Sequence, residues 1–201
     1  MEASTVPLFQ SSFIGYNLQL GIHNTQTLAA SVETSGSSKQ LAPFGVSYTP
    51  FQADAQCKPQ QEVEADIQKL QDYGYVRTYG TECNQAYTVL SVVRKYGLKV
   101  MFGISTIDGL ERNIEMIAGP VDALDDKWTS VDTVVVGNEQ VNSGETTADK
   151  VATAVRIARQ KLRTAGYSGP IVTVDTFNTI ILHPELCQVS DYVAAQLPSV
   201  F

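Results

Sequence analysis

A short stretch of the chain, Thr133 to Glu139, places an amide and a carboxylate directly after a run of three valines. Consecutive β-branched residues are typical of a strand that is buried on both faces, and Gly137 is expected to break that strand. Asn138 and Glu139 would then lie at the carboxyl end of the strand, where α/β folds collect their chemistry. An Asn-Glu pair at such a place can bind a sugar hydroxyl and protonate a leaving oxygen. The alternative is an ordinary strand-to-helix turn with a solvated Glu.

The elements that would position this pair follow a regular pattern from Phe44 onward. Apolar runs predict strands over 44–51, 75–79, 99–104, 131–136, 171–174 and 192–195. Helical spacing of apolar residues predicts a helix between each successive pair of the first five strands. The first of these helices covers 62–73, the second is capped by Asn84, and the third is stopped by Gly119-Pro120. The fourth is opened by a capping box of Thr146 and Asp149 and closed by Gly166.

Alternation of strands and helices with short connections predicts a parallel sheet covered by helices, either doubly wound or closed into a barrel. No glycine fingerprint follows the first strand, so a nucleotide-binding fold loses its main support. Polar and aromatic residues instead cluster at the strand ends, which suits a barrel mouth that binds sugar. This set consists of Tyr48, Arg77, Tyr79, Glu82, Asn138, Glu139, Asp175 and Phe177. For a single tyrosine, the alternative is that it merely fills a strand position.

Composition limits the partners of this chain of 201 residues. A formal net charge of -7 opposes binding to phosphate backbones, so we expect no nucleic-acid partner. No apolar run reaches the length of about 20 residues that spans a bilayer. We expect a low-complexity N-terminal tail over residues 1–43 and one domain over 44–201. Within the tail, residues 13–22 make a poor secretory signal, because no Lys or Arg precedes them.

The histidines and cysteines predict no metal site. His23 and His183 are far apart in the sequence, and the three cysteines lack the spacing of a zinc site, so we expect neither a metal nor a cofactor. Cys57 and Cys83 follow the first and second predicted strands, whose ends should be neighbours. A disulfide between these two is therefore expected, with reduced buried thiols as the alternative.

Four motifs in order resemble glycoside hydrolase family 17, most closely its fungal cell-wall branch. They are Phe44-Gly45-Val46-Ser47-Tyr48-Thr49-Pro50-Phe51, Val76-Arg77-Thr78-Tyr79-Gly80-Thr81-Glu82-Cys83-Asn84-Gln85, Val136-Gly137-Asn138-Glu139 and Val172-Thr173-Val174-Asp175-Thr176-Phe177. The resemblance implies an incomplete (β/α)8 TIM barrel of about six βα units. It also implies a secreted, cell-wall protein that acts on β-1,3-glucan. Glu139 would be the general acid/base of a retaining mechanism and Asn138 would contact the sugar. The binding cleft would be formed by Tyr48, Tyr79, Arg77, Asp175 and Phe177.

The sequence departs from the family pattern in two places. Position 82 is usually Asp in such motifs, and here it is Glu82. The family's nucleophile is a second Glu in a Glu-Ser-Gly-Trp-like motif, which we do not find before Phe201. We therefore expect a truncated chain that is inactive by itself and that self-associates through open barrel edges. The alternative is a non-catalytic β-glucan-binding protein, and the sequence does not separate hydrolysis from transglycosylation.

Overall fold

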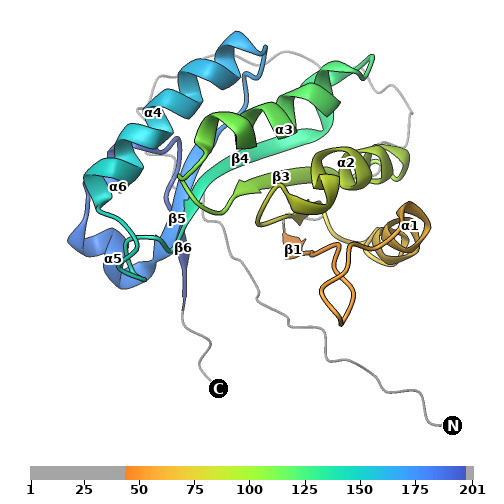
Figure 1. The fold of residues 1–201 in the computed structure, drawn as a ribbon, viewed down its shortest axis with the longest axis horizontal. Coiled ribbons are helices and arrows are strands. Elements are labelled where there is room, and N and C mark those ends of the chain that lie inside the picture. Colours follow the sequence, from red (N-terminus) through yellow and green to blue (C-terminus); the bar gives the residue numbers. More distant parts are fainter. Residues whose placement is uncertain (1–43, 198–201) are drawn as a thin grey trace, which may run out of the picture.

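The computed structural model describes residues 44–197, which form a curled sheet of six parallel strands with helices along its convex side (Figure 1). The strands are β1 (Gly45–Ser47), β2 (Tyr75–Arg77), β3 (Lys99–Ile104), β4 (Val131–Asn138), β5 (Ile171–Thr176) and β6 (Ala194–Gln196). The α-helices are α1 (Gln60–Gln68), α2 (Gln85–Lys95), α3 (Leu110–Asp122), α4 (Ala148–Thr164), α5 (Phe177–Leu182) and α6 (Glu185–Val189). Two 3-10 helices, η1 (Glu82–Asn84) and η2 (Lys127–Ser130), complete the set.

The order of the strands decides between the two predicted architectures. Each strand pairs in parallel with the next one along the chain, from β1 to β6. A doubly wound sheet would reverse its strand order at a switch point, whereas a barrel adds strands in sequence. The prediction of a partial TIM barrel is therefore confirmed. Within the described residues, β1 and β6 are the edges of the sheet.

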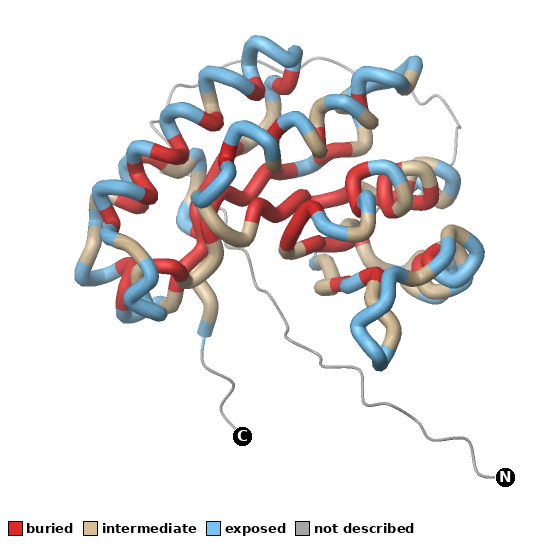
Figure 2. Tube along the Cα trace, viewed as in Figure 1, coloured by how far each residue is buried: buried red, intermediate tan, exposed pale blue. Residues whose placement is uncertain are grey.

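Two groups of apolar side chains cover the two faces of the sheet. The larger core lies between the strands and the helices, and Figure 2 shows the central strands and the inward faces of the helices as buried. On α4, the stripe of Val151, Val155, Ala158 and Leu162 predicted from helical spacing is buried against the sheet. A smaller cluster on the concave face includes Met101, Val135, Val172, Val174 and Ala194.

Several predicted boundaries are wrong. Helix α3 continues through Pro120 to Asp122, although Pro120 has no N–H to donate to the carbonyl of Met116, and the fully buried Val121 favours this continuation. The expected capping box does not form, since Thr147 is the N-cap of α4 and makes no side-chain cap bond. Strand β1 covers only Gly45–Ser47. The short helices α5 and α6 were not predicted, because neither is long enough to show a helical period.

The predicted tail, residues 1–43, lies outside the described residues, so the division of the chain at residue 44 stays a prediction. Among the described helices, none has the length and apolar character needed to span a membrane.

Candidate functional site

A bulge at the end of β4 determines where Asn138 points. Val134 and Val136 belong to the helix-side core, so strict alternation would turn Asn138 toward the helices as well. The pairing with β5 shifts, because Val135 is opposite Val172 whereas Asn138 is opposite Val174. One extra residue on β4 re-aims the side chains that follow it. Asn138 thereby meets groups on the concave face of the sheet.

Gly137 permits this bulge. Its φ of +82° is in the left-handed region, which residues with a side chain rarely adopt. A Cβ added there would lie 3.4 Å from Gln140 Oε1 and from Thr173 Oγ1. The next residue on the chain, Glu139, also has a positive φ of 53°, and its backbone N–H donates to Val174 O at 2.8 Å. The backbone that carries the carboxylate is thus anchored on β5.

Two donors hold the amide oxygen of Asn138. Arg77 Nη2 donates to Asn138 Oδ1 at 2.8 Å, and Gln196 Nε2 donates to the same atom at 2.9 Å. Because a guanidinium carries only donors, the atom facing Arg77 is the oxygen of the amide. The Nδ2 group of Asn138 has no hydrogen-bond partner among residues 44–197 and remains available as a donor.

Arg77 lies inside the curled sheet with 3% of its surface exposed. Its guanidinium lies 4.5 Å from the centre of the Tyr79 ring, and the Tyr79 hydroxyl is 3.2 Å from Ser47 Oγ. Burial lowers the pKa of Arg77, while the nearby tyrosines and the carboxylate of Glu139 oppose that shift. Arginine stays charged at neutral pH, so this end of the sheet holds a fixed cation.

The Glu139 carboxylate is half-buried and accepts no hydrogen bond from any described residue. Its neighbour Gln140 is 4% exposed and ties the loop after β4 to the loop after β3. Gln140 Oε1 accepts from Ile107 N at 2.8 Å, and Nε2 donates to Thr106 Oγ1 at 3.0 Å and Glu145 Oε2 at 3.2 Å. Glu139 thus carries a carboxylate that has no hydrogen-bond partner among residues 44–197, on a firmly held backbone and beside the Asn138 amide, whose orientation is fixed. A proton donor or a hydrogen-bond acceptor can act from such a position.

The structure brings together Arg77, Tyr79, Asn138 and Glu139 of the predicted site, but it places Tyr48 elsewhere. Ser47 faces the concave side, so Tyr48 faces the helices and lies in the helix-side core. Its hydroxyl donates to Asp66 Oδ2 of α1 at 3.3 Å, and burial together with that carboxylate raises its pKa. The predicted role of Tyr48 in the cleft therefore has no support from its position.

Asp175 lies near the end of β5 and Phe177 comes directly after that strand, and the two have different surroundings. Asp175 is 2% exposed, and both of its carboxylate oxygens accept backbone N–H groups. Oδ2 accepts from Val141 N at 3.1 Å and Oδ1 from Thr176 N at 2.8 Å, so Asp175 holds the loop after β4, and its predicted contact with a ligand stays a prediction. Phe177 begins α5 and is 48% exposed.

Sequence reasoning missed Gln140 and Gln196. Gln196 is two residues after Ala194 of the concave cluster, so the period of a strand could have placed it on that face. No comparable signal marks Gln140, because its position depends on the irregular loop backbone after Glu139.

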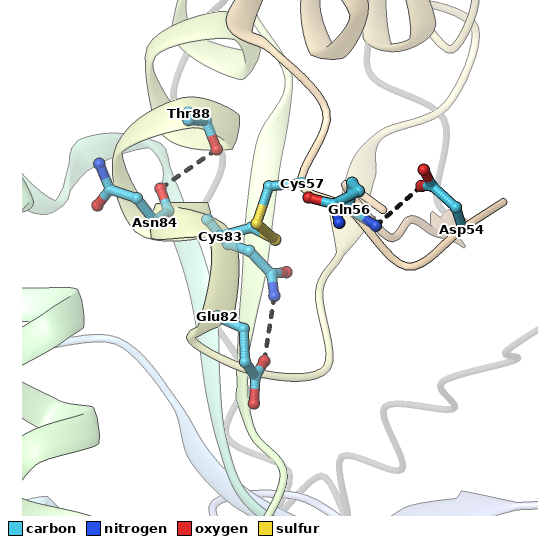
Figure 3. The surroundings of a disulfide bond; sticks show 8 residues. Asp54, Gln56, Cys57, Glu82, Cys83, Asn84 and Thr88 are labelled. Atoms are coloured by element: carbon cyan, nitrogen blue, oxygen red, sulfur yellow. Dashed lines mark hydrogen bonds between the residues drawn. A yellow bond between two sulfur atoms is a disulfide. The ribbon is translucent and has the colours of Figure 1, made fainter. Parts of the chain in front are cut away.

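The expected disulfide is present and joins Cys57, after β1, to Cys83 of η1 (Figure 3). Cys83 and Asn84 both have positive φ, at 55° and 50°. Glu82 folds back over Gly80, where an added Cβ would lie 2.0 Å from Glu82 Oε2. Glu82 Oε2 also accepts from Gln85 Nε2 at 3.5 Å, so Glu82 is packed against its own loop. Cys187 is the free cysteine, and the described residues contain no cluster of potential metal ligands.

A family model described as the BtgE/BtgC glycoside hydrolase domain matches residues 45–201. This chain belongs to the BtgE/BtgC glycoside hydrolase family. The resemblance to the fungal branch of glycoside hydrolase family 17 is thereby confirmed.

Curated relatives of the same family are longer than this chain. It is 38% identical over 157 residues to the Saccharomyces cerevisiae protein named "Probable family 17 glucosidase SCW4", an alignment that covers 78% of this chain and 40% of the relative. It is 33% identical to the "Cell surface mannoprotein MP65" of Candida albicans, covering 84% of this chain and 44% of the relative. The chain therefore spans less than half the length of these relatives.

A solved structure shares the fold. The crystal structure of a family 17 β-1,3-glucanosyltransferase from Rhizomucor miehei matches with a TM-score of 0.62 and 20% identity, over 73% of this chain and 54% of that chain. An active-site mutant of the same enzyme, in complex with laminaritriose, matches equally well. At this level of identity, the match supports the partial barrel fold.

Proposed function

We propose that this chain binds β-1,3-glucan at the carboxyl ends of its strands, and that Glu139 is the general acid/base of a retaining glycoside hydrolase site. The observation that carries the proposal is the half-buried Glu139 carboxylate, without a described partner, beside the fixed amide of Asn138. The fungal relatives support the substrate class, since one is named a family 17 glucosidase. The solved structure of similar fold, a β-1,3-glucanosyltransferase, was also obtained in complex with laminaritriose.

In this proposal each side chain has a separate task. Glu139 protonates the glycosidic oxygen as the bond to the leaving sugar breaks. Asn138 donates through Nδ2 to the 2-hydroxyl of the sugar. The stacked pair of Arg77 and Tyr79 forms the floor of the cleft, and the exposed ring of Phe177 offers an apolar surface for a pyranose.

Turnover needs a second carboxylate. A retaining mechanism places two carboxyl groups about 5 Å apart, one of which attacks the sugar. Asp175, the strand-end carboxylate that follows Glu139, already has both oxygens on backbone N–H groups. We therefore propose that this polypeptide binds glucan without appreciable turnover, which is also how the alternative function, a non-catalytic β-glucan-binding protein, would behave.

Titration calorimetry tests the binding. The folded protein should bind laminari-oligosaccharides in preference to cello-oligosaccharides of the same length, and equal or absent binding would refute the proposal. An assay on laminarin tests the chemistry. We expect the parent and Glu139→Gln to release sugar at the same background rate. Robust turnover that disappears in Glu139→Gln would show that another carboxylate replaces the expected nucleophile.

A location at the cell wall and self-association through the sheet edges complete the proposal. The Cys57–Cys83 disulfide suits an oxidising compartment, and one relative is named a cell surface mannoprotein. The edge strands β1 and β6 present backbone groups that pair on one side only within the described sheet.

A further inference from the structure

The amide of Asn138 is held from two sides by strands that are not its neighbours. Arg77 reaches it from β2 and Gln196 reaches it from β6. Strand β5 lies between β4 and β6, so Gln196 crosses over β5 on the concave face. Adjacent strands are about 4.8 Å apart, so this span of two strand spacings requires a long side chain.

The two contacts have different chemical meanings. Arg77 is a permanent donor, so by itself it requires that an oxygen face it. The amide group of Gln196 could present either an oxygen or a nitrogen, and it presents Nε2 because it meets an acceptor. A second donor on the same oxygen fixes the plane of the Asn138 amide as well as its direction. The Nδ2 hydrogens of Asn138 are then directed away from both donors.

We propose that Gln196 is a positioning residue: with Arg77 it locks the amide of Asn138 so that Nδ2 is presented as a donor to the ligand. This inference rests on the proposed function only for the identity of that ligand, β-1,3-glucan. Gln196 is itself half-buried on the last described strand. The orientation of Asn138, set on β4, thus depends on the correct placement of β6.

Two substitutions of Gln196 distinguish the effect of its Nε2 donor from the effect of its length. Gln196→Leu keeps most of the volume and removes the donor. Gln196→Glu keeps the length but offers only acceptors, which repel Asn138 Oδ1 and attract Arg77. Gln188→Leu, on the exposed side of α6, makes the same chemical change away from the site and is the matched control.

The first readout does not require sugar. The two Nδ2 proton signals of Asn138 in an amide NMR spectrum can be identified by their loss in Asn138→Asp. Hydrogen bonds to the carbonyl oxygen polarise an amide, so we expect these signals to shift and broaden in Gln196→Leu and Gln196→Glu but not in Gln188→Leu. Unchanged Asn138 signals in both Gln196 variants would overturn the proposal.

The second readout is the affinity for laminari-oligosaccharides. Loss of one orienting hydrogen bond should weaken binding roughly 3- to 10-fold in Gln196→Leu, and further in Gln196→Glu. Weaker binding with unchanged Asn138 signals would mean that Gln196 touches the sugar directly, which contradicts a positioning role. If the parent binds no glucan but the Asn138 signals still respond, the proposed function fails and the positioning role of Gln196 stands.

Discussion

At the scale of single residues, the conformation of Gly137 decides the geometry of the site. The extra residue on β4 turns Asn138 toward Arg77, and the positive φ of Gly137 makes that turn possible. A side chain at this position would meet both a strained backbone and the polar groups of Gln140 and Thr173.

We therefore expect Gly137→Ala to lower the free energy of unfolding by about 1 to 2 kcal/mol, the usual cost of placing a residue with a Cβ in the left-handed region. Chemical denaturation measures the change. Gly119→Ala is the control, because Gly119 lies within α3 with open space around its Cβ position. That substitution keeps an ordinary helical φ, and its gain in helix propensity is opposed by contact of the new Cβ with the ring of Pro120, so it should change stability less than Gly137→Ala does. Equal effects at the two positions would contradict this account of Gly137.

The sequence was enough to locate Asn138 and Glu139 but not to predict the direction of their side chains. Three valines and a glycine were enough to place Asn138 and Glu139 at a strand end. The left-handed turn at Gly137 could not be predicted, because glycine also commonly ends strands in an ordinary conformation. Tyr48 was misplaced for a related reason: the direction of its side chain depends on which residues of β1 face inward, and that choice became visible only with Ser47 beside Tyr79.

At the scale of elements, an ionic link fastens α4 to the start of β5. Asp191 Oδ2 accepts from Arg159 Nη1 and from Ile171 N, both at 2.7 Å. Arg159 Nη2 also donates to Val189 O of α6 at 2.7 Å. Burial alone would raise the pKa of Asp191, but these hydrogen bonds and the charges of Arg159 and Arg163 lower it overall.

Because the pKa of Asp191 is lowered in the folded state, its ionised form stabilises the fold. This contribution is complete above the ordinary Asp pKa of about 4 and is lost as the pH falls below it. Asp191→Asn should therefore cost about 1 kcal/mol at pH 7, a value reduced for a side chain that is 37% exposed. The cost, measured by urea denaturation, should fall as the pH is lowered from 7 through the acid range. Asp122→Asn, in an exposed pair with Lys127, is the control and should change stability only slightly. A constant cost for Asp191→Asn across this range would argue against the ionic link.

The disulfide fastens the loop after β1 to η1, and its cysteines are 26 residues apart. Closing a loop of this length restricts the unfolded chain, which corresponds to roughly 3 kcal/mol of stability. Replacing both Cys57 and Cys83 by Ser should remove stability of this order, whereas Cys187→Ser should have little effect. Peptide mapping without reduction should recover the linked pair from the parent protein. Free thiols at both positions would contradict the bridge.

At the scale of the whole molecule, the sheet formed by residues 44–197 has β1 and β6 at its two edges, and apolar side chains are exposed near β6. Ile181 and Leu182 of α5 are 61% and 74% exposed, and Val193 and Leu197 flank β6 at 52% and 67%. Figure 1 shows α5 beside β6. A strand such as β6, which pairs on one side only within the described sheet, favours association between chains when exposed apolar groups lie beside it.

We expect concentration-dependent association in sedimentation velocity, which Leu182→Lys should weaken. Ile157→Lys places the same charge on an exposed apolar position of α4, away from the edge, and should leave association unchanged. A parent protein that remains monomeric at all concentrations would refute the role of this edge.

The fold was more predictable than the site. Strand and helix periods establish the sequential alternation of elements, and the order of pairing follows from it. Side-chain contacts across strands, such as Gln196 over β5 to Asn138, depend on the curvature of the sheet, which no local pattern records.

The central claim is that β-1,3-glucan binds beside Asn138 and Glu139. Calorimetric titration of one laminari-oligosaccharide into the parent, into Asn138→Ala and into the control Gln160→Ala on α4 tests it most directly. Asn138→Ala removes the Nδ2 donor, so its affinity for the oligosaccharide should be roughly 10-fold lower than that of the parent. Gln160→Ala should bind with the affinity of the parent. Equal affinity of Asn138→Ala and the parent would place the glucan elsewhere and would contradict this account of the site.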